Sequence, residues 1–153
     1  MLTAQHTAII DQDPARVGIW MGDHGGGHWR EGGTCIGLER EGQLVAGVMY
    51  DYYNGASIFA HIAIAGPITR EWLRRICHYP SIQLGCQVVI GLVASDNQAA
   101  QQFDAHFGFK KRLDIAGADP AGSLLIYTLD KADCRFLGRS HHGETESTTR
   151  PGL

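Results

Sequence analysis

The chain has 153 residues, of which 44% are hydrophobic, 19% are charged and 20 are glycine. A chain of this length is expected to fold as one domain with a sizeable core, and its glycines predict many turns. The net charge of −3 and the pI near 6.2 argue against a general nucleic-acid-binding protein, because such proteins usually carry a basic surplus.

The first predicted elements are a strand at residues 7–11 and a helix that begins after Asp13. Aspartate is a favoured capping residue, and Pro14 suits the first helical turn. Glycines 25–27 then end the helix. We therefore expect a flexible loop over residues 22–33.

Three strands follow, and two turn signals separate them. Glu41 and Gly42 form the first signal, and Asn54 and Gly55 form the second. These turns predict an antiparallel meander. Its strands are residues 34–41, 43–53 and 56–65.

The middle of the chain predicts a helix, a buried strand and another helix. Thr69 can cap the first of these helices, and Pro80 is expected to stop it. The almost unbroken apolar run over residues 87–94 is typical of a strand that is buried on both faces. The next helix follows Asn97 and ends at Gly108, a residue suited to a helix C-terminus. Its expected apolar face comprises Ala99, Ala100, Phe103 and Phe107.

The last elements are a hairpin with strands at residues 110–116 and 123–130, and a short amphipathic segment at residues 132–137. The complete order is β-α-β-β-β-α-β-α-β-β. It predicts an α+β (mixed α/β) fold, with a central mixed, mostly antiparallel sheet of about seven strands and helices on both faces. We expect one domain over residues 1–137. Residues 138–153 are polar and are expected to form a disordered tail.

The cysteines show no metal-binding spacing and no C-x-x-C pair. We expect core thiols in a reducing compartment rather than disulfides. The sequence shows neither the N-terminal apolar run of a signal peptide nor a run of about 18 apolar residues. These features predict a soluble, cytoplasmic protein. The four cysteines are Cys35, Cys77, Cys86 and Cys134.

The segment after the buried strand carries a family pattern. Asn97, Ala100, Gly108 and Phe109 hold fixed positions of the pattern N-x-x-A-x-x-x-Y-x-x-x-G-F. Together with the element order over about residues 7–130, this segment resembles the GNAT superfamily of acyl-CoA-dependent N-acetyltransferases. The resemblance implies a splayed pair of parallel strands, with a cleft at their C-terminal ends.

The resemblance also implies that acetyl-CoA is the acyl donor and lies in this cleft. The freed backbone of the splayed strand, residues 57–65, would pair with the pantetheine arm like an added strand. The start of the following helix would hold the pyrophosphate with its free N–H groups and its dipole. The residues implied in cofactor binding are Ile62, Ala63, Ile64, Ala65, Gly66, Ile68, Thr69, Arg70, Glu71, Asn97, Ala100 and Phe103.

The implied phosphate loop departs from the family's usual Arg/Gln-x-x-Gly-x-Gly/Ala. Only Gly66 remains as a glycine, and Pro67 removes one backbone donor. Thr69 and Arg70 can compensate, because a hydroxyl and a guanidinium are good phosphate donors. In the alternative interpretation, Thr69 only caps the helix and Arg70 is solvated.

The second departure is Asp104, which stands where many family members have the tyrosine taken to protonate the leaving CoA thiolate. An ordinary aspartate, with a pKa of about 3.9, is ionised at neutral pH and cannot donate a proton. The favoured interpretation is therefore an exposed helix aspartate. As a general acid, Asp104 would need a strongly raised pKa. Otherwise the proton comes from water or from a tyrosine elsewhere, the candidates being Tyr50, Tyr52, Tyr53 and Tyr127.

His61 is the candidate general base, because it lies in the splayed strand and histidine titrates near neutral pH. A hydrogen-bonded core histidine is the alternative interpretation. Two residues at the end of the preceding strand are weaker candidates. Tyr52 is a candidate for catalysis, and Asp51 is a candidate for the acceptor side.

The resemblance implies that the loop DHGGGHW, which carries His24 and His28, borders the acceptor groove, with Trp29 lining the pocket. His24 and His28 are four residues apart, but the glycines between them exclude a helical metal-binding pair. We expect no metal at this loop. A plain surface loop is the alternative interpretation.

Together these features predict an N-acetyltransferase that moves an acetyl group from acetyl-CoA to the amine of a small molecule or peptide, by direct attack in a ternary complex. Two alternatives stay open: a GNAT fold repurposed for DNA modification, as in the phage Mom-like proteins, and a non-catalytic module that binds acyl-CoA or a partner. The acidic net charge weighs against nucleic acid. Residues 110–130 offer a sheet edge for a homodimer, and no membrane partner is expected.

Overall fold

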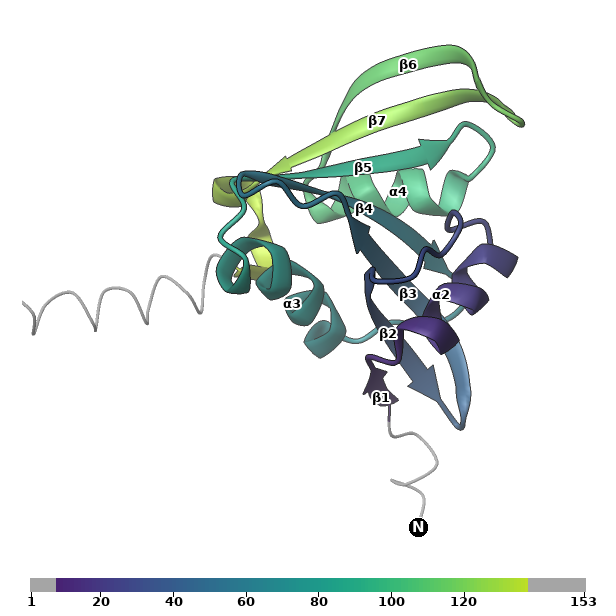
Figure 1. Cartoon of the computed structure of the whole chain (residues 1–153), viewed down its shortest axis with the longest axis vertical. Coiled ribbons are helices and arrows are strands. Elements are labelled where there is room, and N and C mark those ends of the chain that lie inside the picture. Colours follow the sequence, from purple (N-terminus) through teal and green to yellow (C-terminus); the bar gives the residue numbers. More distant parts are fainter. Residues whose placement is uncertain (1–7, 138–153) are drawn as a thin grey trace, which may run out of the picture.

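The computed structural model describes residues 8–137, which form one seven-stranded sheet with helices on both faces (Figure 1). The strands lie in the order β1-β2-β3-β4-β5-β7-β6. Their bounds are β1 Ala8–Asp11, β2 Thr34–Arg40, β3 Gln43–Asp51, β4 Ser57–Ile64, β5 Val88–Ala94, β6 Lys110–Asp119 and β7 Gly122–Asp130. The helices are α2 Pro14–Asp23, α3 Arg70–His78 and α4 Gln98–Phe107, with a π-helical turn η1 Tyr79–Gln83 and a 3-10 turn η2 Lys131–Asp133.

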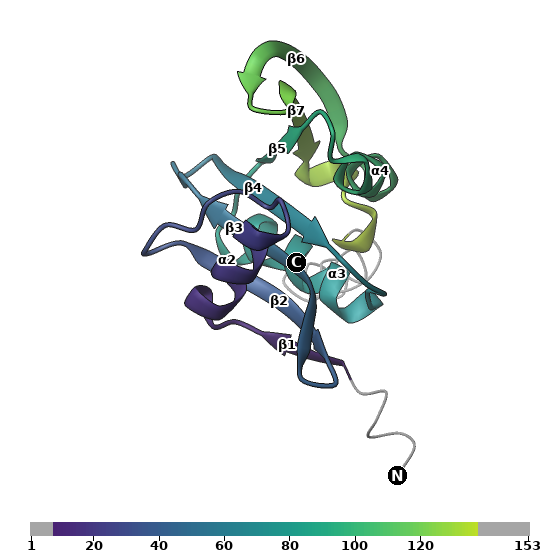
Figure 2. The ribbon, with the colours of Figure 1, turned by 90° about the vertical axis from the view of Figure 1, so that its right-hand side faces the viewer.

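The predicted α+β fold and its element order are confirmed. β4 and β5 are parallel, and the other neighbouring strands are antiparallel. Helix α2 covers β2 and β3 on one face of the sheet, and α3 and α4 lie on the other face (Figure 2). The expected tail, residues 138–153, lies outside the described residues, so the domain boundary stays a prediction.

Side chains set where the helices begin. Asp13, Thr69 and Asn97 precede α2, α3 and α4, and the side chain of each accepts a hydrogen bond from a backbone N–H of the first turn. Gly108 ends α4 with a φ of 120°, a value that favours glycine. Over residues 8–137, none of these helices combines the length and the apolar character needed to span a bilayer.

The α-helix ends just before Pro80, as predicted, but a helical turn continues through this residue. Helix α3 ends at His78, but the chain passes directly into η1, where Pro80 occupies the first turn. The first turn of a helix leaves its N–H groups unpaired, so a proline is tolerated there. The turn carries Pro80 and Ser81 into the interior, where both are buried.

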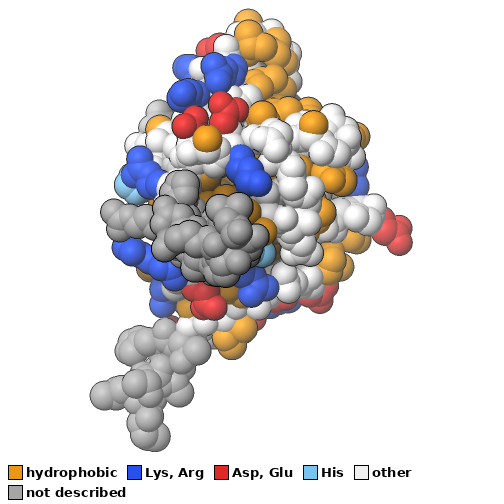
Figure 3. Space-filling model, turned by 90° about the vertical axis from the view of Figure 1, so that its left-hand side faces the viewer, with side chains coloured by type: hydrophobic (Ala, Val, Ile, Leu, Met, Phe, Trp, Pro, Cys, Tyr) orange, Lys and Arg blue, Asp and Glu red, His pale blue; other side chains and the backbone are white. Residues whose placement is uncertain are grey.

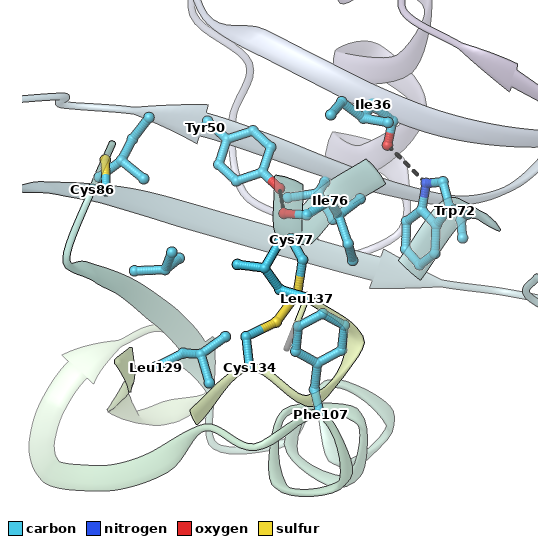
Figure 4. Close-up of a cluster of buried hydrophobic side chains, with 14 of the residues drawn as sticks. Ile36, Tyr50, Trp72, Ile76, Cys77, Cys86, Phe107, Leu129, Cys134 and Leu137 are labelled. Carbon is cyan, nitrogen blue, oxygen red and sulfur yellow. Dashed lines mark hydrogen bonds between the residues drawn. A yellow bond between two sulfur atoms is a disulfide. The ribbon is translucent and has the colours of Figure 1, made fainter. Parts of the chain in front are cut away.

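The main core lies between the sheet and the pair formed by α3 and α4 (Figure 4). Trp72 of α3 is fully buried, and its Nε1 donates to the backbone oxygen of Ile36 at 3.1 Å. Tyr50 of β3 is 3% exposed, and its hydroxyl donates to the backbone oxygen of Ile76 at 2.6 Å. These bonds satisfy the polar ends of two large aromatic side chains, so burial of the rings stabilises the packing of α3 on the sheet.

The expectation of core thiols is wrong for two of the cysteines. Cys77, in the last turn of α3, forms a disulfide with Cys134, which follows η2 (Figure 4). The two residues are 57 positions apart in the sequence, and only the fold brings them together. Cys35 and Cys86 are buried free thiols, as expected.

Strand β6 forms an exposed edge of the sheet. Its residues are exposed up to Ala118, including Leu113 at 55% and Ile115 at 40% exposure. Figure 3 shows hydrophobic side chains gathered at the top of the molecule, where β6 and β7 lie. The predicted homodimer through this edge stays a prediction.

Candidate active site

Strands β4 and β5 diverge toward their C-terminal ends (Figure 1), and residues of both strands line hollows at this cleft. These parallel strands pair over four positions, and the last pair is Ala60 opposite Gly91. β4 then continues to Ile64 and β5 to Ala94. The splayed parallel pair implied by the resemblance is therefore present.

The open edge of β4 carries free backbone groups. Ala65 N donates to Val45 O at 2.7 Å, and hydrogen-bonding positions alternate along an antiparallel pair. Ile62 and Ile64 therefore direct their N–H and C=O groups away from β3 and toward β5. Beyond Ala60, no strand within residues 8–137 pairs with these groups, so an extended ligand can bind them.

Two cavities flank the cleft, one on each face of the sheet. The inner cavity, which Asp104 lines, lies beside α3 and α4 and has about 30 Å³. The outer cavity, which His61 lines, lies beside the loop after α2 and has about 270 Å³. Ile62 of β4 and Leu92 of β5 line both cavities. Side chains of the splayed strands thus lie between the two cavities.

His61 and Asp51 form a pair in the outer cavity. His61 Nε2 lies 3.6 Å from Oδ2 of Asp51, the last residue of β3. Burial lowers the pKa of His61, and the Asp51 carboxylate opposes this effect. The imidazole is therefore neutral at pH 7, and Asp51 favours the tautomer with the proton on Nε2. Nδ1 is then the ring atom free to accept a proton.

One oxygen atom of Asp51, Oδ1, is buried without a hydrogen-bond partner among the described residues. A buried carboxylate oxygen without a partner is unfavourable, so an ammonium group at this position would stabilise it. This places the predicted acceptor-side residue next to the predicted base.

Arg30 and Tyr52 form the rim of the outer cavity. Arg30 Nη1 donates to the Tyr52 hydroxyl and lies 4.0 Å from Asp51 Oδ2. Tyr52 is 62% exposed and has a φ of 56°, which is unusual for a residue other than glycine. Sequence reasoning missed Arg30, because it lies in a loop far along the chain from both partners.

The glycines of the loop allow it to pack against β4. A Cβ on Gly26 would lie 2.9 Å from Met21 Cε and 3.1 Å from Ala63 Cβ. A Cβ on Gly27 would lie 3.2 Å from His61 Nδ1, and its φ of 89° also favours glycine. The loop therefore approaches Nδ1 of His61, and this approach depends on the absence of side chains.

Replacing Gly27 with alanine is expected to disturb His61. The new methyl group meets Nδ1, and the left-handed backbone costs about 1 kcal/mol for alanine. Gly25→Ala is the matched control, because Gly25 has a φ of 79° and its Cβ would lie 3.9 Å from the nearest atom. Both variants should melt a few degrees lower, but only Gly27→Ala should shift the imidazole signals of His61 in the NMR spectrum. Equal imidazole spectra for the two variants would contradict this arrangement.

The other predicted acceptor-side residues lie in different places. His24 stacks on Trp20 at 4.1 Å, and its Nδ1 lies 2.8 Å from the Trp20 backbone oxygen. His24 and His28 are exposed on an adjoining hollow, and His28 also lines the outer cavity. The Trp29 ring packs against Gly18 of α2 and away from the cleft. Over residues 8–137, no three side chains of the metal-binding types are grouped to hold an ion.

Asp104 contradicts the exposed-aspartate interpretation. It is 3% exposed, lies on the buried face of α4 with Ala100 and Phe107, and lines the inner cavity. A Cβ on Gly91 would lie 3.4 Å from Asp104 Oδ2, so the carboxyl sits next to the last paired position of β5. Burial raises the pKa of Asp104 to about 7. The side chain is therefore partly protonated at neutral pH and can donate a proton.

The start of α3 has the features of an anion site, with one contribution that the sequence did not reveal. Thr69 Oγ1 accepts a bond from Trp72 N at 3.1 Å, so Thr69 is the helix cap, and Arg70 is exposed. Arg40, at the end of β2, donates from Nε to the Pro67 backbone oxygen at 3.3 Å. A second guanidinium thus lies beside the loop and adds to the positive end of the helix.

The family pattern in α4 has a structural basis. Asn97 Oδ1 accepts from Ala100 N at 3.1 Å, and Asn97 also lines the outer cavity. Ala100 is buried, and Phe103 lines the inner cavity. Among the β4 residues, Ala63 packs its side chain beneath α2, whereas Ile62 lines both cavities.

Comparisons with known proteins identify the fold. No protein-family profile matches the chain, and no curated protein matches it. The spermidine/spermine N-acetyltransferase SpeG from Vibrio cholerae, solved with manganese ions, matches with a TM-score of 0.65 and 13% identity, over 90% of this chain and 98% of that chain.

Two further structures match less completely. The yncA protein from Salmonella typhimurium, solved with its cofactor acetyl-CoA, gives a TM-score of 0.58 and 12% identity, over 81% of this chain and 94% of that chain. A protein named as a probable acetyltransferase gives 0.56 and 18%, over 65% of this chain and 61% of that chain. At these identities the likeness establishes the fold.

Proposed function

We propose that this chain, which has the fold of the GNAT acetyltransferases, transfers an acetyl group from acetyl-CoA to an amine. The observation that carries the proposal is the opening of the sheet after Ala60, which leaves the backbone of Ile62 and Ile64 free. Acetyl-CoA would supply an activated acetyl group on a thioester, and its pantetheine arm carries amides that such an edge can bind. The bound acetyl-CoA named for yncA supports this choice of donor.

The start of α3 would hold the pyrophosphate. Its unpaired N–H groups and dipole favour an anion, and Thr69 keeps a hydroxyl proton to donate. Arg70 and Arg40 would add two guanidinium groups. These groups take over the role that glycines have in the family's usual loop.

His61 would act as the general base on the acceptor side. Nδ1 would accept the proton that the amine loses, and the Asp51 carboxylate would stabilise the imidazolium that forms. Arg30 would hold Tyr52 and Asp51 in position at the rim. Tyr52, His24 and His28 would contact the acceptor from the outer cavity and its surroundings.

Asp104 would act as the general acid on the donor side. Its carboxyl lies in the inner cavity, on the opposite face of the sheet from His61, and holds a proton near neutral pH. The sulfur atom of CoA needs a proton as it leaves, and a neutral carboxyl can supply it. The acid and the base would thus work from opposite faces of the cleft.

The acceptor is proposed to be a small amine or a peptide amine. The free Oδ1 atom of Asp51 favours a group that arrives as an ammonium. SpeG is named for its action on spermidine and spermine, which agrees with an amine of low mass. Because acetyl-CoA is a metabolite of the cytoplasm, we propose that the protein works there.

Titration calorimetry with acetyl-CoA tests the function directly. We expect binding in the micromolar range, and Arg70→Ala should weaken it about tenfold, because one charge-assisted hydrogen bond is lost. Arg112→Ala is the control, since Arg112 is exposed on β6 and bonds Thr128 instead. Absence of binding at millimolar acetyl-CoA would refute the function. Binding without CoA release over a broad amine panel would favour a non-catalytic acyl-CoA module.

A further inference from the structure

We infer that the inner cavity binds the acyl chain of the thioester, and that an acyl group of three or four carbons fits it better than acetyl does. The inference rests on the proposed use of an acyl-CoA and extends it to the class of acyl group. It depends on the lining, the size and the position of the cavity.

The lining of the inner cavity is apolar on nearly every side. Besides Tyr50, whose hydroxyl is bonded to the Ile76 backbone oxygen, its polar side chains are Ser81 of η1 and Asp104 of α4, each 3% exposed. Strand and helix residues supply the rest, and some of them appear in Figure 4. They include Val48, Ala60, Ile76, Val89, Phe103 and Leu129. Such a surface favours a hydrocarbon chain over water.

The size of the cavity limits the length of the acyl chain that it can hold. The cavity has about 30 Å³, and on this measure one water needs about 10–15 Å³. There is room for about two groups of the size of water or a methylene. An acetyl group extended by one or two carbons would therefore fill it, and a six-carbon chain would exceed it.

The position of the cavity joins it to the cleft. Two small residues, Ala60 and Gly91, form the last pair before the strands diverge, and both line the cavity. Because Gly91 lacks a side chain, the space next to Asp104 stays open. Beyond this point the cavity continues toward Pro80 and Ser81 of η1. A thioester beside Asp104 can thus direct its acyl chain between α3 and α4.

Binding measurements with the full chain test the inference without an acceptor. Calorimetry should compare CoA, acetyl-CoA, propionyl-CoA, butyryl-CoA and hexanoyl-CoA. We expect about a fourfold gain in affinity for each carbon from acetyl to butyryl, the effect of burying one methylene, and a loss at hexanoyl. Affinity that is flat or falls from acetyl to butyryl would overturn the acyl pocket but leave the proposed function. Failure of every thioester to bind would overturn both.

A pair of leucines on β7 provides matched variants. Leu129 and Leu125 are 4% and 3% exposed, but only Leu129 lines the inner cavity. Leu129→Ala should shift the preferred acyl chain toward hexanoyl, because it enlarges the inner cavity. Leu125→Ala should leave the ratio of butyryl to acetyl affinity unchanged. The same ratio in both variants would overturn the inference, and Val89→Phe, which fills the cavity, should lower that ratio in the wild-type background.

Discussion

Asp104→Asn is expected to remove a strong pH dependence from the stability of the protein. Burial raises the pKa of Asp104 to about 7 in the folded state, against an ordinary value of 3.8. Between these values the folded chain holds a proton that the unfolded chain has lost. Stability contributed by this proton is therefore complete below about pH 4 and declines as the pH rises to about 7.

The size of the effect follows from the two pKa values. At pH 7 the ionisable carboxyl should lower the free energy of unfolding by about 4 kcal/mol relative to acidic pH. Denaturant titrations from pH 4 to 8 measure it. Over this range the wild type should lose more stability than Asp104→Asn. At pH 8 the variant should be the more stable of the two.

A matched control separates Asp104 from the other carboxylates. Asp114 is exposed on β6, so Asp114→Asn should keep the full slope of the wild type. If the slopes of the wild type and Asp104→Asn coincide, the carboxyl is not buried as described. Asp104→Asn should also lower turnover by about a hundredfold or more, because an amide cannot donate the proton that we propose Asp104 gives to the leaving sulfur.

His61→Gln is expected to lower turnover by about a hundredfold or more, with little change in acetyl-CoA binding. Glutamine keeps a polar side chain but cannot accept the amine proton at neutral pH. His106→Gln is the control, because His106 is an exposed histidine on α4. CoA release with the best acceptor of an amine panel measures the loss. Wild-type rates for His61→Gln would refute the assignment of the base.

The pH profile gives this prediction a second readout. Burial lowers the pKa of His61, so loss of the base form should begin only below the ordinary histidine value of about 6.5. Loss of the proton on Asp104 should lower the rate as the pH rises through about 7. The wild type should therefore show a bell-shaped profile, and His61→Gln should lack its acidic limb.

The fold could be predicted from the sequence because its signals are local. The turn at Glu41 and Gly42 shows positive φ values at both residues, as a two-residue hairpin requires. The buried strand and the capped α4 helix also depend on neighbouring residues. The order of such elements predicted the mixed sheet, and the resemblance to the GNAT superfamily added its splayed parallel pair.

The candidate site was harder, because it depends on which residues meet in space. In α4 the sequence suggested an apolar face with Ala99, but Ala99 is exposed and Asp104 is buried. Helical spacing places position 104 between Ala100 and Phe107 on one face, and the general preference of aspartate for water concealed this. Arg40 was missed for a related reason, since the turn before α3 meets β2 only in the folded chain.

The short pairing of β4 with β5 has a mechanical consequence. The sheet consists of two parts, β1 to β4 and β5 to β7, which are joined by the four residue pairs between β4 and β5. The disulfide between Cys77 and Cys134 adds a covalent link between α3, which packs on the first part, and the segment that follows the second part. A ligand bound between the diverging ends of β4 and β5 would connect the two parts at a third place. It would then act as a structural part of the sheet while it is bound.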